Sequence, residues 1–361
     1  MPAISVLMTV YNGEAFLSDA IKSILNQTFN DFEFIIVDNA STDSSVKIIE
    51  SFFDSRIRLV KNLSNQGQTK ALNIGLRVSR GRYIARIDAD DVARAHRLET
   101  QFNFLEKQTK YSVVGSHVCL IDSRGAQWHT LYFPVNYEDI TWVALHASPV
   151  AHSAVLMRSS VILELGGYDE SFVITQDYAL WTALIGKGHR ITNFDNVLTC
   201  LRVHPGQLSR GDGQSQLLNE TTRLIRKNVA SQLNIYASDE ETKGLFCLLR
   251  HSASVSSYPI ETSLKLFYEF SSVFKYRVNQ NSFFYVKTLV RLAILRKELP
   301  FLVRGKILFR AVFSLCFTKN AYSAVVFICR WIFTGKFFGA LRMELWRRRR
   351  QNSGNHLTEL Q

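Results

Sequence analysis

Three aspartates stand within four positions, directly after a short apolar run that predicts a β-strand. They are Asp88, Asp90 and Asp91. Carboxylates so close together repel one another, and a hard cation such as Mg²⁺ or Mn²⁺ would relieve that repulsion while phosphate oxygens completed its shell. The same residues are compatible with a solvated acidic loop, or with Asp91 capping a helix that starts near Ala93. The spacing favours neither interpretation over the other.

A fourth carboxylate, Asp38, ends another predicted strand and is followed by a polar segment that runs to Asp43. Its oxygens can accept hydrogen bonds from a ribose hydroxyl or a base N–H, whereas Ser41 and Asp43 fit a turn and a helix cap. The chain has no G-x-G-x-x-G segment after its first strand and no Walker sequence. A nucleotide site here is therefore of neither the dinucleotide nor the P-loop type.

The elements that must position these residues alternate between strand and helix. Apolar runs predict strands at 4–8, 32–37, 57–60 and 83–87. Residues with helical spacing lie between them, and this βαβαβαβ order predicts a mainly parallel, Rossmann-like α/β sheet with helices on both faces. Ligands of such sheets bind beyond the carboxyl ends of the strands, which is where Tyr11, Asp38 and Asp88 stand.

The rest of the chain changes character at about residue 212. Before it, strands are predicted at 113–121 and 152–157, and a helix over 176–185. After it, long helical patterns rich in Phe, Leu, Lys and Arg replace the strands. A chain of 361 residues with 47% apolar and 20% charged residues is long enough for two globular domains. We expect an α/β domain over residues 1–212 and a helical, basic region over residues 213–361.

The net charge of +12 is concentrated near the C-terminus, which indicates that this part of the chain binds an anionic partner. Residues 281–350 hold 15 Lys or Arg and two acids, so this part faces something anionic, either phospholipid headgroups or a nucleic acid. The basic residues alternate with large apolar ones, and no helix-turn-helix, RRM or finger pattern occurs, so no nucleic-acid partner is expected.

The apolar stretch 321–339 contains Arg330 and Lys336, which are costly inside a spanning helix. Helices lying in the membrane interface are favoured, with the arginines at 347–350 reaching acidic headgroups. The five cysteines form no C-x-x-C pair and no signal peptide is visible. This argues against a disulfide framework and predicts a cytoplasmic protein, peripheral at the inner face of the cell membrane.

Four segments stand in order, each at a strand end or in the following helix. They are Ser5-Val-Leu-Met-Thr-Val-Tyr-Asn12, Ile36-Val-Asp-Asn-Ala-Ser-Thr-Asp43, Asn65-Gln-Gly-Gln-Thr-Lys-Ala-Leu-Asn-Ile-Gly75 and Gly81-Arg-Tyr-Ile-Ala-Arg-Ile-Asp-Ala-Asp-Asp91. Together they resemble the inverting family 2 glycosyltransferases of the bacterial cell-surface polysaccharide type. The resemblance runs from Ile4 to about Ser209 and implies the GT-A nucleotide-diphospho-sugar transferase fold.

On the donor side, the resemblance implies that Thr9 and Tyr11 line the nucleotide pocket and that Asp38 recognises the base. Lys70 stands where the family often has Arg, near the base or the diphosphate. The implied donor is a nucleotide sugar, with UDP the commonest nucleotide in the family.

The resemblance also implies a divalent cation, Mn²⁺ or Mg²⁺, at a D-x-D-type site. Asp88 and Asp90 would meet the donor diphosphate, with Asp90 and Asp91 nearest the metal. His204, in the segment Leu201-Arg-Val-His-Pro, is a candidate further ligand, although a lone histidine more often forms hydrogen bonds in a loop.

The general base of the family is the second acid of an E-D pair at the start of a helix, which here reads Gln176-Asp177. The resemblance therefore implies that Asp177 is the catalytic base, while Gln176 departs from the family. Without the resemblance, Asp177 is an acid favoured at a helix N-terminus. His152 is expected on the acceptor side, and Trp181 either stacks there on a sugar or packs in the core.

The expected activity is transfer of a single sugar, with inversion, to a lipid-linked or polysaccharide acceptor in cell-surface glycan synthesis. The Q-x-x-R-W sequence of processive synthases is absent, which favours single addition. Two alternatives stay open: a catalytically inactive partner subunit, suggested by the altered Gln176-Asp177 pair, and a basic nucleic-acid-binding protein.

Overall fold

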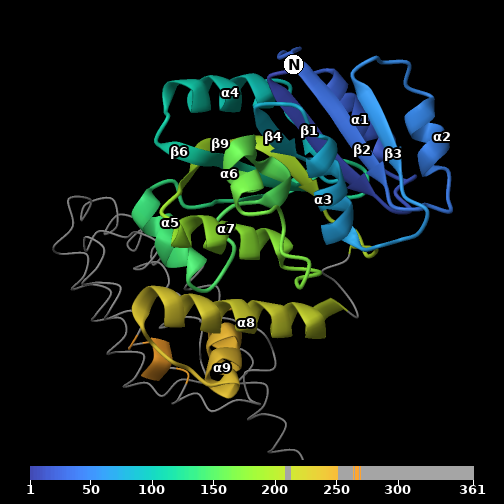
Figure 1. Ribbon diagram of the computed structural model, residues 1–361. Helices are drawn as coiled ribbons and strands as arrows, with labels where there is room; N and C mark the ends of the chain where they lie inside the picture. The colour runs from blue at the N-terminus through green and yellow to red at the C-terminus, as the bar shows by residue number, and fades with distance from the viewer. Residues whose placement is uncertain (208–212, 251–262, 264, 268, 270–361) are drawn as a thin grey trace, which may run out of the picture. The chain divides into compact units, whose positions relative to one another are not determined.

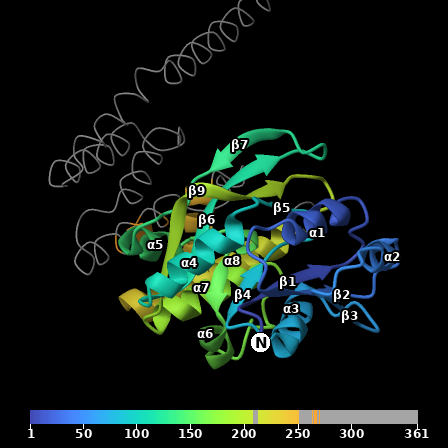
Figure 2. The same ribbon diagram turned by 90° about the horizontal axis from the view of Figure 1, so that it is seen from above.

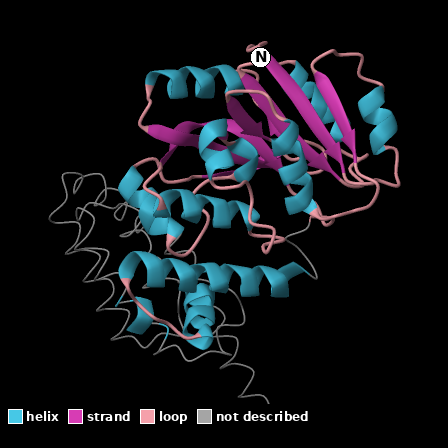
Figure 3. Cartoon of the chain, in the orientation of Figure 1, coloured by secondary structure: helices cyan, strands magenta, loops and turns pink. Residues whose placement is uncertain are grey.

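The strands form one mixed sheet, and helices lie on both of its faces (Figure 1 and Figure 3). This computed structural model describes residues 1–207, 213–250, 263, 265–267 and 269 of the chain. The strands are β1 Ile4–Val10, β2 Phe32–Asp38, β3 Ile57–Lys61, β4 Tyr83–Arg86, β5 Val92–Ala93, β6 Tyr111–Ile121, β7 Gln127–Leu131, β8 Leu156–Arg158 and β9 Arg190–Arg202. The helices are α1 Leu17–Leu25, α2 Ser45–Glu50, α3 Gln68–Val78, α4 Arg97–Lys107, α5 Tyr137–Ala144, the 3-10 turn η1 His152–Ala154, α6 Ser159–Glu164, α7 Gln176–Gly186, α8 Gly213–Leu233 and α9 Asp239–Arg250.

The N-terminal half of the sheet is parallel, as the sequence predicts. The order along the sheet is β3-β2-β1-β4-β8-β6-β9-β5, with β7 paired to β6 outside this path. The neighbours β3, β2, β1 and β4 all run in the same direction. Every residue of β1 and β2 is buried, because helices cover both faces of a parallel sheet and leave its strands no polar side.

Successive side chains of β1 enter two separate cores. Val6 and Met8 pack on one face with residues of α1, α2 and α4. Leu7 packs on the other face with residues of α3 and α7. This alternation is the period-two geometry of a strand, and it fixes which helices share a face. As a result α3 and α7 lie on the same side of the sheet.

The second half of the sheet differs from the sequence prediction in several places. Residues 152–157, predicted as one strand, form the turn η1 followed by the short strand β8, which is antiparallel to β4. The helix expected near Ala93 begins instead at Arg97, because Val92 and Ala93 pair with β9. Strand β9 lacks a clear apolar alternation and was not predicted, although it runs along most of β6. Figure 2 shows β7 beside β6 on the side of the sheet away from β1.

One sequence expectation about cysteines needs correction. Cys119 of β6 and Cys200 of β9 are paired partners in adjacent strands, and the structure joins them as a disulfide. The sequence argued against disulfides because the cysteines are scattered, but register between strands brings residues together that lie 81 positions apart. Cys247 is buried in α9.

Helices α8 and α9 follow the sheet within the same compact unit, Met1–Val278. None of the helices in the described part of the chain has both the length and the apolar content that a membrane span requires. The boundary at residue 212 stays a prediction. The stretch 321–339 and the arginines at 347–350 lie outside the described residues.

Candidate active site

The predicted donor residues lie at the carboxyl edge of the parallel strands. Thr9 near the end of β1 is buried, and Asp38 at the end of β2 is 2% exposed. The backbone N–H of Ser41 donates to both carboxylate oxygens of Asp38, at 3.3 Å each. Tyr11 is half-exposed just beyond β1, and Lys70 is exposed in the first turn of α3. Their roles in nucleotide binding stay predictions.

Asn39, next to Asp38, is a residue that sequence reasoning did not single out. Its Oδ1 accepts from Asn62 Nδ2 at 2.9 Å and from the N–H of Gln66 at 3.2 Å, and its Nδ2 donates to Asn65 Oδ1 at 2.7 Å. These bonds tie the loop before α3 to the end of β2. The next residue, Ala40, has a φ of 64°, a left-handed conformation that non-glycine residues rarely adopt.

The three aspartates of the sequence cluster converge in space. One carboxylate oxygen from each of Asp88, Asp90 and Asp91 lies within 4.8 Å of the others. Burial raises the pKa of Asp91 well above its usual range, and the charges of Asp88 and Asp90 raise it further. Burial and the charge of Asp88 likewise raise the pKa of Asp90. A divalent cation among these oxygens would remove the repulsion, so the donor set fits such an ion.

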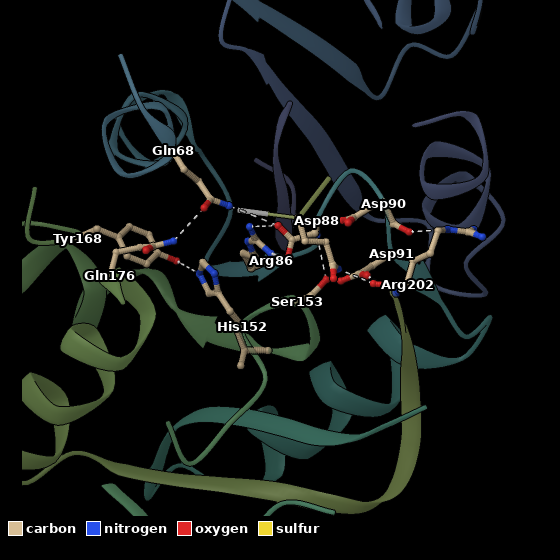
Figure 4. Close-up of polar contacts among 12 residues, drawn as sticks. Gln68, Arg86, Asp88, Asp90, Asp91, His152, Ser153, Tyr168, Gln176 and Arg202 are labelled. Atoms are coloured by element: carbon tan, nitrogen blue, oxygen red, sulfur yellow. Dashed lines mark hydrogen bonds and ion pairs between the residues drawn. The ribbon is translucent and has the colours of Figure 1, made fainter. Parts of the chain in front are cut away.

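The cluster is held in place by residues from distant parts of the chain (Figure 4). The fully buried Arg86 forms an ion pair with Asp88, whose N–H donates to Ser153 Oγ at 2.9 Å. The N–H of Arg202 donates to Asp91 Oδ1 at 2.9 Å, and its Nε donates to the carbonyl oxygen of Asp90 at 3.0 Å. The sequence prediction missed all three supports. The one local feature that could have pointed to Arg86 is its charge, because it stands in an otherwise apolar strand.

Arg202 also connects this cluster to α1 and to the turn before β7. Its Nη1 donates to the carbonyl oxygens of Asp122 and Ser123, both at 3.2 Å, and its Nη2 pairs with Asp19 at 3.2 Å. His204, two residues further on, places Nε2 2.9 Å from Asp90 Oδ2. His204 therefore contacts the cluster through Asp90, and its role as a metal ligand stays a prediction.

The candidate base Asp177 lies in the first turn of α7, and the side chain of its neighbour Gln176 is linked to the aspartate cluster through Gln68. Gln176 Nε2 donates to Gln68 Oε1 at 3.1 Å, and Gln68 Nε2 donates to Asp88 Oδ1 at 3.4 Å (Figure 4). Burial raises the pKa of Asp177 to about 6. Ser148 Oγ donates to Asp177 Oδ2 at 3.5 Å. A pKa near the working pH is the property that a general base requires, so the pKa of Asp177 is compatible with that role.

The two residues predicted on the acceptor side, His152 of η1 and Trp181 of α7, lie near each other. His152 Nε2 is 2.7 Å from the hydroxyl oxygen of Tyr168, and its ring centroid is 6.1 Å from that of Trp181. Burial and then the charge of Arg86 keep the pKa of His152 well below its usual range, so this imidazole is neutral at pH 7. Trp181 is fully buried and packs in the core against α3 and the sheet. Contact of either residue with an acceptor stays a prediction.

Comparisons with known proteins agree with this geometry. The profile described as Glycosyl transferase family 2 matches residues 5–166. An uncharacterized glycosyltransferase of Haemophilus influenzae is 31% identical over 245 residues, which cover 64% of this chain and 75% of that protein. The chain belongs to glycosyltransferase family 2.

Two further relatives of this glycosyltransferase are informative. The Escherichia coli protein WfaP, a UDP-Glc:alpha-D-GlcNAc-diphosphoundecaprenol beta-1,3-glucosyltransferase, is 29% identical over 66% of this chain and 89% of its own. The structure of S. aureus TarS residues 1–349 in complex with UDP-GlcNAc superposes with a TM-score of 0.54, at 16% identity over 80% of each chain. Its likeness shows the shared GT-A fold. The family profile ends before α7, so Asp177 lies beyond the matched segment.

Two sets of carboxylates in this glycosyltransferase are candidates for separate roles. The cluster of Asp88, Asp90 and Asp91 is compatible with a divalent cation. Asp177 lies beside Gln176, at the other end of the link through Gln68, and its role as the base stays a prediction.

Proposed function

We propose that this glycosyltransferase moves a single sugar, with inversion, from a UDP-sugar donor to a lipid-linked or polysaccharide acceptor in cell-surface glycan synthesis. The observation that carries the proposal is the link from Asp88 through Gln68 to Gln176, which joins the candidate diphosphate site to the helix of the candidate base. The printed activity of WfaP, which uses UDP-Glc and a diphosphoundecaprenol-linked sugar, supports this choice of substrates. The UDP-GlcNAc complex of TarS supports a UDP donor.

In the proposed reaction, Asp177 accepts the proton of the acceptor hydroxyl as its oxygen bonds to the anomeric carbon of the donor sugar. The bond from that carbon to the diphosphate breaks on the opposite face, so the configuration inverts. The pKa of about 6 leaves Asp177 largely ionised at neutral pH. Asp90 and Asp91 would hold the divalent cation, which would compensate the charge of the departing diphosphate near Asp88 and Asp90.

The site of action that we propose is the inner face of the cell membrane. The basic and apolar residues of 281–350 would bind acidic headgroups there. A lipid-linked acceptor such as that of WfaP is presented at a membrane, which fits a peripheral enzyme.

The first experiment is a panel of nucleotide sugars, each offered with Mn²⁺ or Mg²⁺ and again with chelator, read out by calorimetric binding and by slow donor hydrolysis. We expect a metal-dependent signal for one UDP-sugar. Asp90→Ala and Asp91→Ala should abolish metal-dependent binding, whereas the exposed Asp195→Ala serves as a control for the lost charge. Unchanged donor affinity in both cluster variants would overturn the cation assignment.

One alternative function is supported by a specific observation: the chain could be a catalytically inactive partner subunit. Gln176 stands where the family has an acid, although the aspartate cluster and Asp177 are present. A folded protein that is silent across the whole panel would favour this alternative.

A further inference from the structure

The loop of residues 168–175 leads directly into α7 and is anchored to α3 on one side. Asn73 Nδ2 donates to the carbonyl oxygen of Tyr168 at 2.9 Å, and Thr69 Oγ1 donates to that of Phe172 at 2.7 Å. The same helix begins with Gln68, the partner of Gln176. These contacts fix the start of the loop relative to the donor side.

The end of this loop is held from α8 by one carboxylate, that of Glu220. Its Oε1 accepts from the N–H of Val173 at 2.9 Å, and its Oε2 accepts from the N–H groups of Ile174 at 3.0 Å and Thr175 at 2.9 Å. The hydroxyl of Thr175 adds a bond to Oε2 at 3.0 Å, and Gln216 Nε2 donates to Oε1 at 2.9 Å. Glu220 is 7% exposed, so five donors surround a buried carboxylate.

The Glu220 carboxylate binds the backbone that immediately precedes α7. Thr175 is the N-cap residue of α7, but its side chain makes no cap hydrogen bond within that helix. Three successive N–H groups before a helix form an anion-binding concavity to which the helix dipole adds attraction. Burial raises the pKa of Glu220, but the bonds from Val173, Ile174 and Thr175 outweigh burial and lower it, so the group is ionised at neutral pH.

Arg223, one turn further along α8, holds the same loop. Its Nη2 donates to Ser171 Oγ at 2.8 Å, and its guanidinium lies 3.9 Å from the ring centroid of Phe172. Helix α8 therefore holds the loop through two side chains: Glu220 binds its end, and Arg223 binds Ser171 and Phe172. Asp177 follows two residues after Thr175, so any shift of the cap carries the candidate base with it.

We propose that Glu220 is a positioning residue for Asp177: from α8, it holds residues 173–175, which lead into α7, so that the Asp177 carboxyl group faces the acceptor hydroxyl. This inference rests on the proposed function, in which Asp177 is the base. It makes α8, which follows the sheet in the chain, a part of the catalytic machinery. The charged or ionisable groups near Asp177 are Arg86, Asp88 and Tyr168, and none of them belongs to α8.

The test compares Glu220→Gln, Glu220→Asp and the exposed Glu240→Gln in the full chain, the last as a control that removes the same charge elsewhere. Misplacing a reacting group by about 1 Å can cost about 100-fold, so we expect kcat of Glu220→Gln to fall by about 10- to 100-fold. Binding of UDP with Mn²⁺ should be unchanged, and Glu220→Asp should recover part of kcat. All rates are measured well below the melting temperature of each variant.

A readout that needs no donor keeps the inference separate from the proposed function. The titration of Asp177 is followed by ¹³C NMR of labelled carboxyl groups and assigned by the signal that Asp177→Asn removes. We expect its midpoint to move toward that of an exposed aspartate in Glu220→Gln and to stay in place in Glu240→Gln. An unchanged midpoint together with an unchanged kcat would overturn the positioning role of Glu220. If Asp177→Asn itself keeps full kcat, the base assignment fails instead.

Discussion

At the scale of single residues, Asp177 is a carboxyl group in surroundings that disfavour its ionised form. Burial raises its pKa to about 6 from 3.8. We expect kcat to fall as the pH drops through about 6, because the base becomes protonated, and Asp177→Asn to lower kcat by about 10²- to 10⁴-fold. A pH–rate profile with the donor found in the panel measures both. A profile that is flat between about pH 5 and 8 would contradict the assignment.

The same shift predicts a gain in stability when the charge is removed. A carboxyl group whose folded pKa lies above its unfolded value stabilises the fold fully below about pH 4, and this contribution is lost as the pH rises through about 6. At about pH 8 the ionised Asp177 opposes folding, so Asp177→Asn should raise the free energy of unfolding by about 1 to 3 kcal/mol. Urea unfolding at about pH 4 and pH 8 checks this, since the gain should be present only at the higher pH.

Gln176 offers a second residue-scale prediction. Its amide donates to Gln68, and Gln176→Glu would replace that donor with a carboxylate next to Asp177. An added negative charge disfavours ionisation of its neighbour, so the acid limb of the pH–rate profile should move to higher pH. The exposed Gln108→Glu is the matched control. A limb that stays in place would show that the residue at 176 does not influence the base.

At the scale of elements, the parallel strands are fastened at the end opposite to the site. Glu33 in β2 accepts from Ser5 Oγ at 2.7 Å and pairs with Arg58 at 2.7 Å and Arg80 at 2.9 Å. Burial alone would raise the pKa of Glu33, but these bonds hold it at about 2. Strands β1, β2 and β3 and the turn before β4 are thereby tied together by one carboxylate.

We expect Glu33→Gln to lower the free energy of unfolding at neutral pH by about 1.5 to 3 kcal/mol, the range for hydrogen bonds to a charged group. Because the folded pKa is depressed, this stabilisation is present above about pH 4.5 and is lost as the pH falls through about 2. Urea titrations of both proteins along this pH range test it. The difference between them should shrink with acidification, and a constant difference would show that charge plays no part.

At the scale of the whole molecule, the remaining prediction concerns the basic end of the chain. Truncation after about residue 280 removes the whole positive excess, so the shortened protein should no longer sediment with anionic vesicles. The full chain should bind them less tightly as the salt concentration rises. Replacing the four arginines at 347–350 by glutamine is the milder variant. Continued sedimentation of the truncated protein would rule out the C-terminal anchor.

The sequence alone determined the parallel half of the sheet and the place of the aspartate cluster. Each apolar run of β1, β2 and β4 reports burial on both faces, and the polar residues that follow must meet at one edge because parallel strands end together. Asp38 and Asp88 could therefore be placed from local patterns. The family resemblance then added Asp177, which no local pattern distinguishes from an ordinary helix N-terminal acid.

Only the tertiary structure decided what supports these residues. Arg202 reaches Asp91 across 111 positions, and Glu220 reaches Thr175 across 45. Such contacts depend on the register of β9 beside β6 and on the packing of α8. Neither the register nor the packing produces a periodic pattern in the sequence that could predict it. The turn at Ser153, where a continuous strand was expected, arises in the same way, because its hydroxyl accepts the N–H of Asp88. Local patterns record which surfaces are buried, whereas the partners of buried polar groups are chosen by the packing of segments far apart in the chain.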